Sequence, residues 1–225
     1  MVKIIAKNIP HVVSEALDAD PVLRLGFERN LISPGTLATH IGALHQDINK
    51  ESLRTAIRRL KRSGSRNQLL ENAERILAQS YLHVRSNIIK IVFKNEESTL
   101  QIINKTFKLN ELYNNDLFRL IKGHSVLNAI CEETHYDKIE SLFSGKIENV
   151  FQGLSEFIIV MPKESMQTPG TLMTLTNELT LSNINIVEQF SSGGEVNIIV
   201  DGGDSQRTFN ILSSLITRCR ERHQK

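Results

Sequence analysis

The residues best suited to bind a small molecule lie in the last third of the chain, beginning with a loop over residues 163–171. Gly170, near the end of this loop, lets a ligand approach the backbone closely. A helix is predicted to start there, and the free N–H groups of its first turn can receive a carboxylate, helped by the helix dipole. Further along, Asn183 and Asn185 offer amide donors and acceptors. These groups favour binding of an amino acid, although an ordinary capped helix and a buried strand fit the same residues.

A second candidate site is a basic, amphipathic helix over residues 51–62, which follows a helix predicted to start at Pro34 with Ser33 as its cap. The pair resembles the helix-turn-helix unit of many DNA-binding regulators, whose cations contact phosphates and base edges. The alternative is a solvated basic face on a small helical domain, because the connection lacks the glycine often found in that turn and no basic hairpin follows. The candidate DNA-binding residues are Arg54, Arg58, Arg59, Lys61 and Arg62.

Residue patterns for catalysis and for cofactor or metal binding are missing from the sequence. The chain has neither a Gly-rich phosphate loop nor a dinucleotide fingerprint. His40 and His45 are five residues apart, which is the wrong offset for one helix face. Glu132, Glu133 and His135 fit a loop and a helix start, where the dipole favours acidic residues. We therefore expect no enzyme activity, no cofactor and no metal site.

Charge is distributed unevenly along the 225 residues. Residues 1–80 carry twelve Lys and Arg against eight Asp and Glu, and the remainder carries fifteen against seventeen. The N-terminal part is therefore the better candidate for contact with an anionic partner. Cys131 and Cys219 do not make a disulfide framework, which favours a reducing cytoplasm. No segment has the length of a membrane span or the pattern of a secretory signal.

The elements around the candidate ligand site follow a clear order, read from the apolar periodicity and the turn residues. They are a strand over residues 157–161, a helix with Leu172, Leu175 and Leu179 on one face, a strand over 183–187, a turn at Gly193 and Gly194, a strand over 196–200 and a helix over 207–222. Such a unit makes a small sheet covered on one face by two helices.

This unit resembles the ACT domain, a module that senses small molecules, usually amino acids, in metabolic enzymes and regulators. The likeness rests on the element order, on a Pro-Gly-Thr-Leu loop and on an Asn-Ile-Asn-Ile segment. It implies a ligand held between the loop of one domain and the Asn-Ile-Asn region of a paired domain. The residues implicated in this way are Ser165, Met166, Gln167, Thr168, Pro169, Gly170, Thr171, Asn183, Ile184 and Asn185. The open alternative is an ACT-like fold that only mediates assembly.

The middle of the chain repeats the element order without the motifs, and therefore looks like a degenerate ACT domain. Its predicted elements are strands over residues 88–93, 117–121 and 126–130 and helices over 98–107 and 135–143. A complete ACT domain has a further strand after the second helix, whereas the chain ends with a helix. We expect residues 147–151 to close the first sheet and residues 81–84 to cross over and close the second, because exposed sheet edges favour such coverage.

The predicted fold is therefore α+β, with a helical N-terminal domain followed by two ferredoxin-like, ACT-type βαββαβ units that exchange edge strands. The predicted domains are residues 1–66, helical and helix-turn-helix-like; 67–80, a connecting helix; 81–152, degenerate ACT-like; and 153–225, ACT-like. This arrangement resembles predicted regulators of amino acid metabolism. The resemblance implies a non-enzymatic, allosteric homo-oligomer that senses an amino acid and binds DNA. The alternative is an effector-binding accessory subunit of an amino-acid-metabolism enzyme, without DNA binding.

Overall fold

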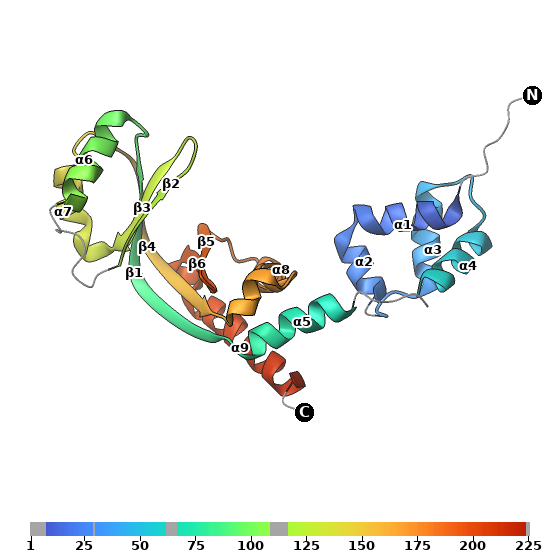
Figure 1. The fold of residues 1–225 in the computed structure, drawn as a ribbon. Coiled ribbons are helices and arrows are strands. Elements are labelled where there is room, and N and C mark those ends of the chain that lie inside the picture. The colour runs from blue at the N-terminus through green and yellow to red at the C-terminus, as the bar shows by residue number, and fades with distance from the viewer. Residues whose placement is uncertain (1–7, 29, 62–66, 109–116, 224–225) are drawn as a thin grey trace, which may run out of the picture. The chain divides into compact units, whose positions relative to one another are not determined.

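The computed structural model describes the chain except residues 1–7, 29, 62–66, 109–116 and 224–225. The chain forms two compact units, residues 1–71 and 72–225 (Figure 1). The first unit is helical throughout its described elements, which are α1 (Ile9–Ala19), α2 (Pro21–Glu28), α3 (Pro34–Leu44) and α4 (Lys50–Lys61). The helix α5 (Asn67–Ala78) spans the boundary between the two units.

The helices of the first unit begin where polar side chains cap them. The Ser33 hydroxyl accepts the backbone N–H of Thr36 at 3.0 Å at the start of α3, as the sequence predicts. The Asn49 side chain accepts the N–H of Glu51 at 2.8 Å at the start of α4. Each cap satisfies a donor that the helix leaves unpaired. The apolar faces then bury a common core that includes Val13, Leu37, Ile41, Leu53 and Ile57.

The second unit is built on one antiparallel six-stranded sheet with the strand order β2-β3-β1-β4-β6-β5 (Figure 1). In chain order its elements are β1 (Tyr81–Phe93), α6 (Glu97–Lys108), β2 (Phe118–Lys122), β3 (Leu127–Glu132), η1 (Glu133–His135), α7 (Tyr136–Leu142), β4 (Ile147–Val160), η2 (Lys163–Gln167), α8 (Thr171–Leu181), β5 (Glu188–Ser192), β6 (Glu195–Asp201), η3 (Gly202–Asp204) and α9 (Ser205–His223). The unit is thus mixed α+β.

Two long strands, β1 and β4, run through both halves of this sheet. Residues 88–93 of β1 pair with β3 and with the first part of β4, and residues 81–85 pair with residues 156–160 of β4. The segments 81–84 and 147–151 therefore make the pairings expected from the sequence, but each continues into a longer strand and the result is one sheet. Asn87 and Gly153, with φ of 58° and 64°, interrupt the two strands where they pass between the halves.

The sheet folds back on itself, so that its two halves face each other. Lys90 on β1 forms an ion pair with Glu188 on β5 at 2.8 Å, and Arg119 on β2 lies 5.0 Å from the centre of the Phe190 ring on β5. In a flat sheet β2 and β5 would be about 24 Å apart, because neighbouring strands are separated by about 4.8 Å. We call β2, β3, α6, α7 and the strand segments paired with them the first half, and β5, β6, α8, α9 and their paired segments the second half.

Helices cover the outer face of each half and apolar side chains fill the space between the halves. The first half packs α6 and α7 onto its strands through a core around Ile91, Phe93 and Phe143. The second half packs α8 and α9 in the same way, with the end of α5 included through Leu77 (Figure 1). The inner layer includes Ile88, Leu117, Ile130, Leu154 and Ile199.

The prediction of a strand over residues 183–187 is wrong. The helix α8 ends at Leu181, and β5 begins only at Glu188. Asn183 adopts a left-handed conformation with φ of 54°, and the N–H groups of Asn183 and Ile184 donate to the carbonyls of Thr180 and Leu179 at 3.0 Å each. This is the Schellman pattern of helix termination, in which Asn is favoured at the left-handed position and the next residue packs back on the helix.

Candidate functional site

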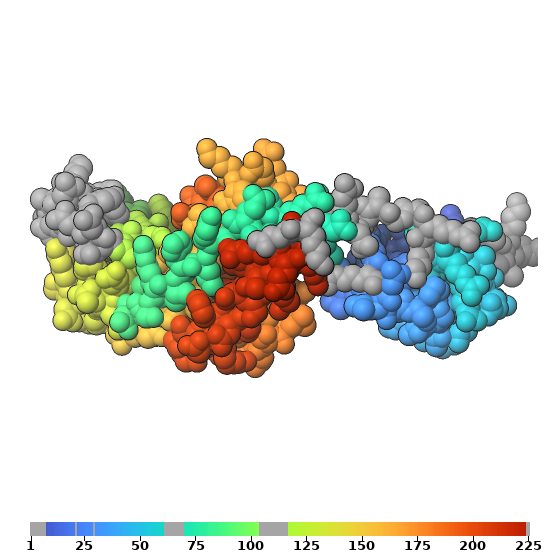
Figure 2. Space-filling view, turned by 90° about the horizontal axis from the view of Figure 1, so that it is seen from below, coloured from blue at the N-terminus to red at the C-terminus, as the bar shows by residue number. Residues whose placement is uncertain are grey.

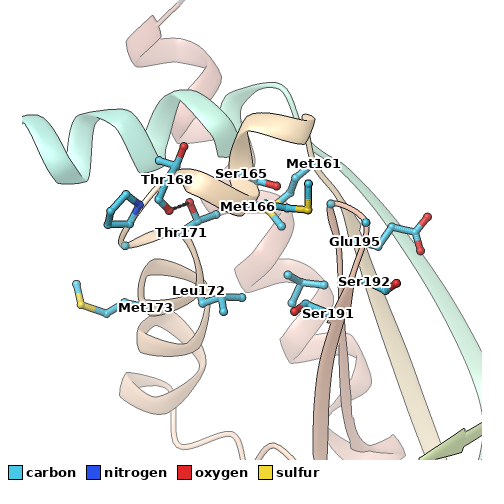
Figure 3. Close-up of a pocket in the computed structure, with 15 residues that line it drawn as sticks. Met161, Ser165, Met166, Thr168, Thr171, Leu172, Met173, Ser191, Ser192 and Glu195 are labelled. Carbon is cyan, nitrogen blue, oxygen red and sulfur yellow. Dashed lines mark hydrogen bonds between the residues drawn. The ribbon is translucent and has the colours of Figure 1, made fainter.

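A cavity of about 420 Å³ lies between the loop that precedes α8 and the hairpin of β5 and β6 (Figure 3). Of the loop residues predicted from the sequence, six line the cavity, and only Gln167 does not. The hairpin wall, residues 191–196, is part of the site that the sequence did not identify. The turn at Gly193 and Gly194 was predicted, but only the folded sheet brings it opposite the loop.

Local hydrogen bonds hold the loop in place before α8. Thr168 Oγ1 donates to the carbonyl of Glu164 at 2.8 Å. Thr171 Oγ1 donates to the carbonyl of Thr168 at 3.1 Å (Figure 3). Gly170 has φ of 90°, in the left-handed region that favours glycine. Because Gly170 has no side chain to cap the helix, the first N–H groups of α8 remain available to an anion at the positive end of the helix dipole.

The remaining walls of the cavity are apolar, with hydroxyl groups at a few positions. Met161, Met166 and Leu172 line it, and Met166 is 66% exposed. Ser191 lies opposite Val196 in the hairpin, on the face of the sheet that packs against helices. Ser165 Oγ is buried without a hydrogen-bond partner among the described residues. The site can therefore hold a ligand that combines a carboxylate, a second polar group and an apolar part.

The Asn-Ile-Asn segment does not reach this cavity within one chain. It follows the end of α8, whereas the loop precedes the start of α8, and the eleven residues of this helix span about 16 Å. Ile184 is buried in the second-half core, and the side chains of Asn183 and Asn185 are exposed. A single chain therefore brings the loop together with the hairpin, and leaves the asparagines available to another surface.

The arginines on the basic face of α4 have different surroundings in the structure. Arg54 forms an ion pair with Glu51 at 2.9 Å, and its guanidinium lies against Gly35 at the start of α3. Arg58 and Arg59 are exposed, and Arg59 lines an open cavity of about 630 Å³ together with Ile9 and Thr55. Arg62 and the side chain of Lys61 lie outside the described residues.

The two cysteines are buried and free. Burial raises the pKa of Cys131 to about 12 and the pKa of Cys219 to about 11. Both thiols therefore stay protonated near neutral pH, a form that is neither nucleophilic nor metal-ligating. Among the described residues, no three His, Cys, Asp or Glu side chains are grouped to hold a metal ion. None of the described helices is long and apolar enough to cross a membrane.

Comparison with known proteins gives no match to a protein-family profile and none to a curated protein sequence. Among solved structures, aspartate kinase from Clostridium acetobutylicum is 18% identical, with 61% of this chain and 34% of that chain covered and a TM-score of 0.50. Aspartate kinase from Synechocystis is 14% identical, with 62% and 27% covered and a TM-score of 0.50. A putative C-terminal regulatory domain of aspartate kinase from Porphyromonas gingivalis W83 is 15% identical, with 61% and 96% covered and a TM-score of 0.47.

The matched part of this chain spans about a third or less of the length of the two kinases. At such low identity the likeness concerns the fold and not the chemistry. The fold of about three fifths of the chain is thus similar to a part of aspartate kinase.

Proposed function

We propose that the chain is a regulatory protein without catalytic activity of its own, in which two ACT-type units, residues 81–152 and 153–225, sense an amino acid. The observation that carries this proposal is the cavity that opens onto the uncapped start of α8. The fold adds support, since the Clostridium aspartate kinase with a similar fold is described as an allosteric enzyme. The free, buried cysteines agree with a reducing cytoplasm as its compartment.

In this proposal the ligand carboxylate binds the first N–H groups of α8, where the helix dipole favours an anion. The apolar part of the ligand packs against Met161, Met166 and Leu172, with thioethers that adapt to its shape. The ligand ammonium is held by Asn183 and Asn185 of a second copy of the chain. The complete site therefore requires a homo-oligomer, in which the loop of one copy meets the asparagines of the other.

The test is a thermal-shift screen against the twenty amino acids, followed by calorimetry on any that stabilise the protein. A ligand at a hundred times its Kd stabilises the native state by about 2.7 kcal/mol, which raises the melting temperature of a unit of this size by roughly 5–10 °C. An absence of any shift at millimolar ligand, with the fold intact, would overturn the sensing role and leave an ACT-like module that only mediates assembly.

For the first unit we propose DNA binding through α4, supported by the exposed Arg58 and Arg59 and by the excess of cations over residues 1–80. The alternative is an accessory subunit that binds an enzyme of amino acid metabolism and not DNA. One observation favours this alternative, because Arg54 is engaged by Glu51 and is less free to meet a phosphate. A measurement of binding to duplex DNA distinguishes these two proposals.

A further inference from the structure

The inner faces of the two halves carry corresponding rows of residues with opposite charge. Each row crosses an outer strand, the adjacent strand and a long central strand in register. The rows are Arg119, Ile130 and Lys90 in the first half and Glu188, Ile199 and Glu156 in the second. The two isoleucines occupy the same position and are both buried in the inner layer. The charged positions on either side of them are cationic in one half and anionic in the other.

These charged residues form two ion pairs across the space between the halves. In each pair the outer strand of one half supplies one residue and the central strand of the other half supplies its partner. Arg119 pairs with Glu156, which is fully buried. Lys90 pairs with Glu188 at 2.8 Å, with side chains 13% and 22% exposed. The two ion pairs therefore occupy corresponding positions, with the positive and negative residues exchanged. Because the pairs are largely buried, salt and water screen their charges poorly.

We propose that this reversal makes the first half pair with the second half and prevents two like halves from pairing. A face built from two first halves would bring Arg119 against Lys90, and a face built from two second halves would bring Glu188 against Glu156. Like charges brought together out of water are strongly unfavourable, and such contacts against the wrong partner are a source of specificity. The partner surface that each half recognises is thus the oppositely charged half of the same chain.

The residues in register with Lys90 and Glu156 on the long strands also disfavour pairing of two first halves. Lys90 lies in register with Phe151 on β4, and Glu156 lies in register with Arg85 on β1. Arg85 approaches Glu156 to 3.7 Å and adds a second cation beside the buried carboxylate. In a pairing of two first halves, β1 would lie beside a second β1, and Lys90 would then face Arg85 in place of Phe151. Three cations would meet at one contact.

The chain needs such discrimination because its halves share one element order and are joined through the long strands β1 and β4. Exchange of like elements between chains is a low-cost route to unwanted assemblies. Without the charge reversal, halves of different chains could pair β1 with β1 and β4 with β4, and this would link chains into dimers or larger assemblies.

The experiment uses full-length variants that keep both ion pairs between the halves complementary and change which halves can pair. The variants that carry Glu156→Arg, among them the quadruple control, also lose the contact of Arg85 with Glu156. In Arg119→Glu with Glu156→Arg, both pairs remain complementary, but pairing of like halves becomes complementary too. Lys90→Glu with Glu188→Lys makes the same change at the less buried pair. The quadruple variant reverses all four charges, so it retains both pairs and again places like charges between like halves. It is the matched control for both double variants.

Each protein is refolded from urea at low and at high concentration and measured by light scattering after size exclusion, with circular dichroism as the check of folding. We expect the quadruple variant to give the same species as the wild type at each concentration. We expect each double variant to form additional, larger species whose share grows with concentration. The proposal is overturned if folded double variants assemble as the wild type does, if the quadruple variant forms the same larger species, or if neither double variant folds.

Discussion

Ser191 and Ser192 are neighbours on β5 whose side chains point to opposite faces of the sheet, because strand residues alternate. Ser191 lies opposite Val196 on the helix-covered face, toward Leu172 and the cavity, whereas Ser192 lies opposite Glu195 (Figure 3). Both serines belong to the hairpin wall of the cavity. The control for a substitution at Ser191 is therefore a serine outside the hairpin, Ser214, which is exposed on α9.

We expect Ser191→Leu to weaken amino acid binding at least tenfold, which is about 1.4 kcal/mol, because the larger side chain enters the space for the ligand. Ser214→Leu, the matched control on α9, should leave the affinity unchanged because Ser214 is exposed and does not line the cavity. Calorimetry with the amino acid found in the screen measures both values. Equal affinity in the two variants would move the ligand site away from this cavity.

The buried thiols give a second prediction at the scale of single residues. Since burial raises the pKa values of Cys131 and Cys219 to about 12 and about 11, the thiolate fraction at pH 8 falls more than about a hundredfold below that of a free cysteine, whose pKa is about 8.5. We expect neither thiol to react with Ellman's reagent in the native protein within minutes. In urea both should react at once. Rapid reaction of the native protein would contradict the described burial.

At the scale of helices and strands, the last turns of α9 hold the end of α5 in the second unit. Arg220 donates to the carbonyls of Ala78 and Ser80 at 3.1 and 2.7 Å, and Arg222 pairs with Glu74 at 2.7 Å. Figure 2 shows α9 in red beside the teal and green surface of α5 and β1. The last residues of α5 are therefore held within the second unit by hydrogen bonds and an ion pair from α9.

We expect Arg220→Ala to lower the free energy of unfolding of the second unit by about 2 kcal/mol, since the variant removes a charged donor and its hydrogen bonds to two carbonyls. Arg218→Ala is the control on the same helix. Arg218 pairs with Glu178 on the surface, and exposed pairs contribute about 0–1 kcal/mol. Urea unfolding followed by circular dichroism compares the two variants. A cost in Arg220→Ala no larger than that in Arg218→Ala would mean that the attachment of α5 does not depend on Arg220.

At the scale of the whole molecule, the shared strands determine which parts of the chain can fold. The second half takes residues 81–85 of β1 as an edge strand and Leu77 as part of its core. We expect a fragment of residues 146–225 to lack cooperative unfolding, because it loses both, whereas residues 72–225 should fold as the intact unit. Heteronuclear NMR spectra of the two fragments distinguish these outcomes. Well-dispersed signals from 146–225 alone would show that the exchanged strand is not required.

DNA binding is tested on the full chain. If α4 binds phosphates, Arg58→Ala with Arg59→Ala should weaken duplex binding and reduce the salt slope by roughly 0.9 for each phosphate that the variant no longer neutralises. Arg218→Ala in the second unit is the control and should change neither quantity. Fluorescence anisotropy over a range of salt concentrations gives both. No duplex binding by the wild type at low salt would leave the accessory-subunit proposal for the first unit.

The sequence alone predicted most elements to within one or two residues, because their signals are local. Apolar periodicity indicated the helices and strands, and Ser33 identified the start of α3. The loop beside the cavity was predicted for the same reason. The segment 183–187 was misread because an Asn that ends a helix and an Asn within a strand look alike in sequence. Only the left-handed conformation of Asn183 distinguishes them.

Tertiary structure decided how these elements meet. The sequence indicated which segments pair, but not that β1 and β4 would be continuous and the sheet folded, because the pairing of Arg119 with Glu156 or of Lys90 with Glu188 joins residues far apart in the chain. The same folding placed the hairpin, and not the asparagines, across from the loop. Periodicity records which face of an element is buried, whereas the identity of what covers that face depends on contacts between distant segments.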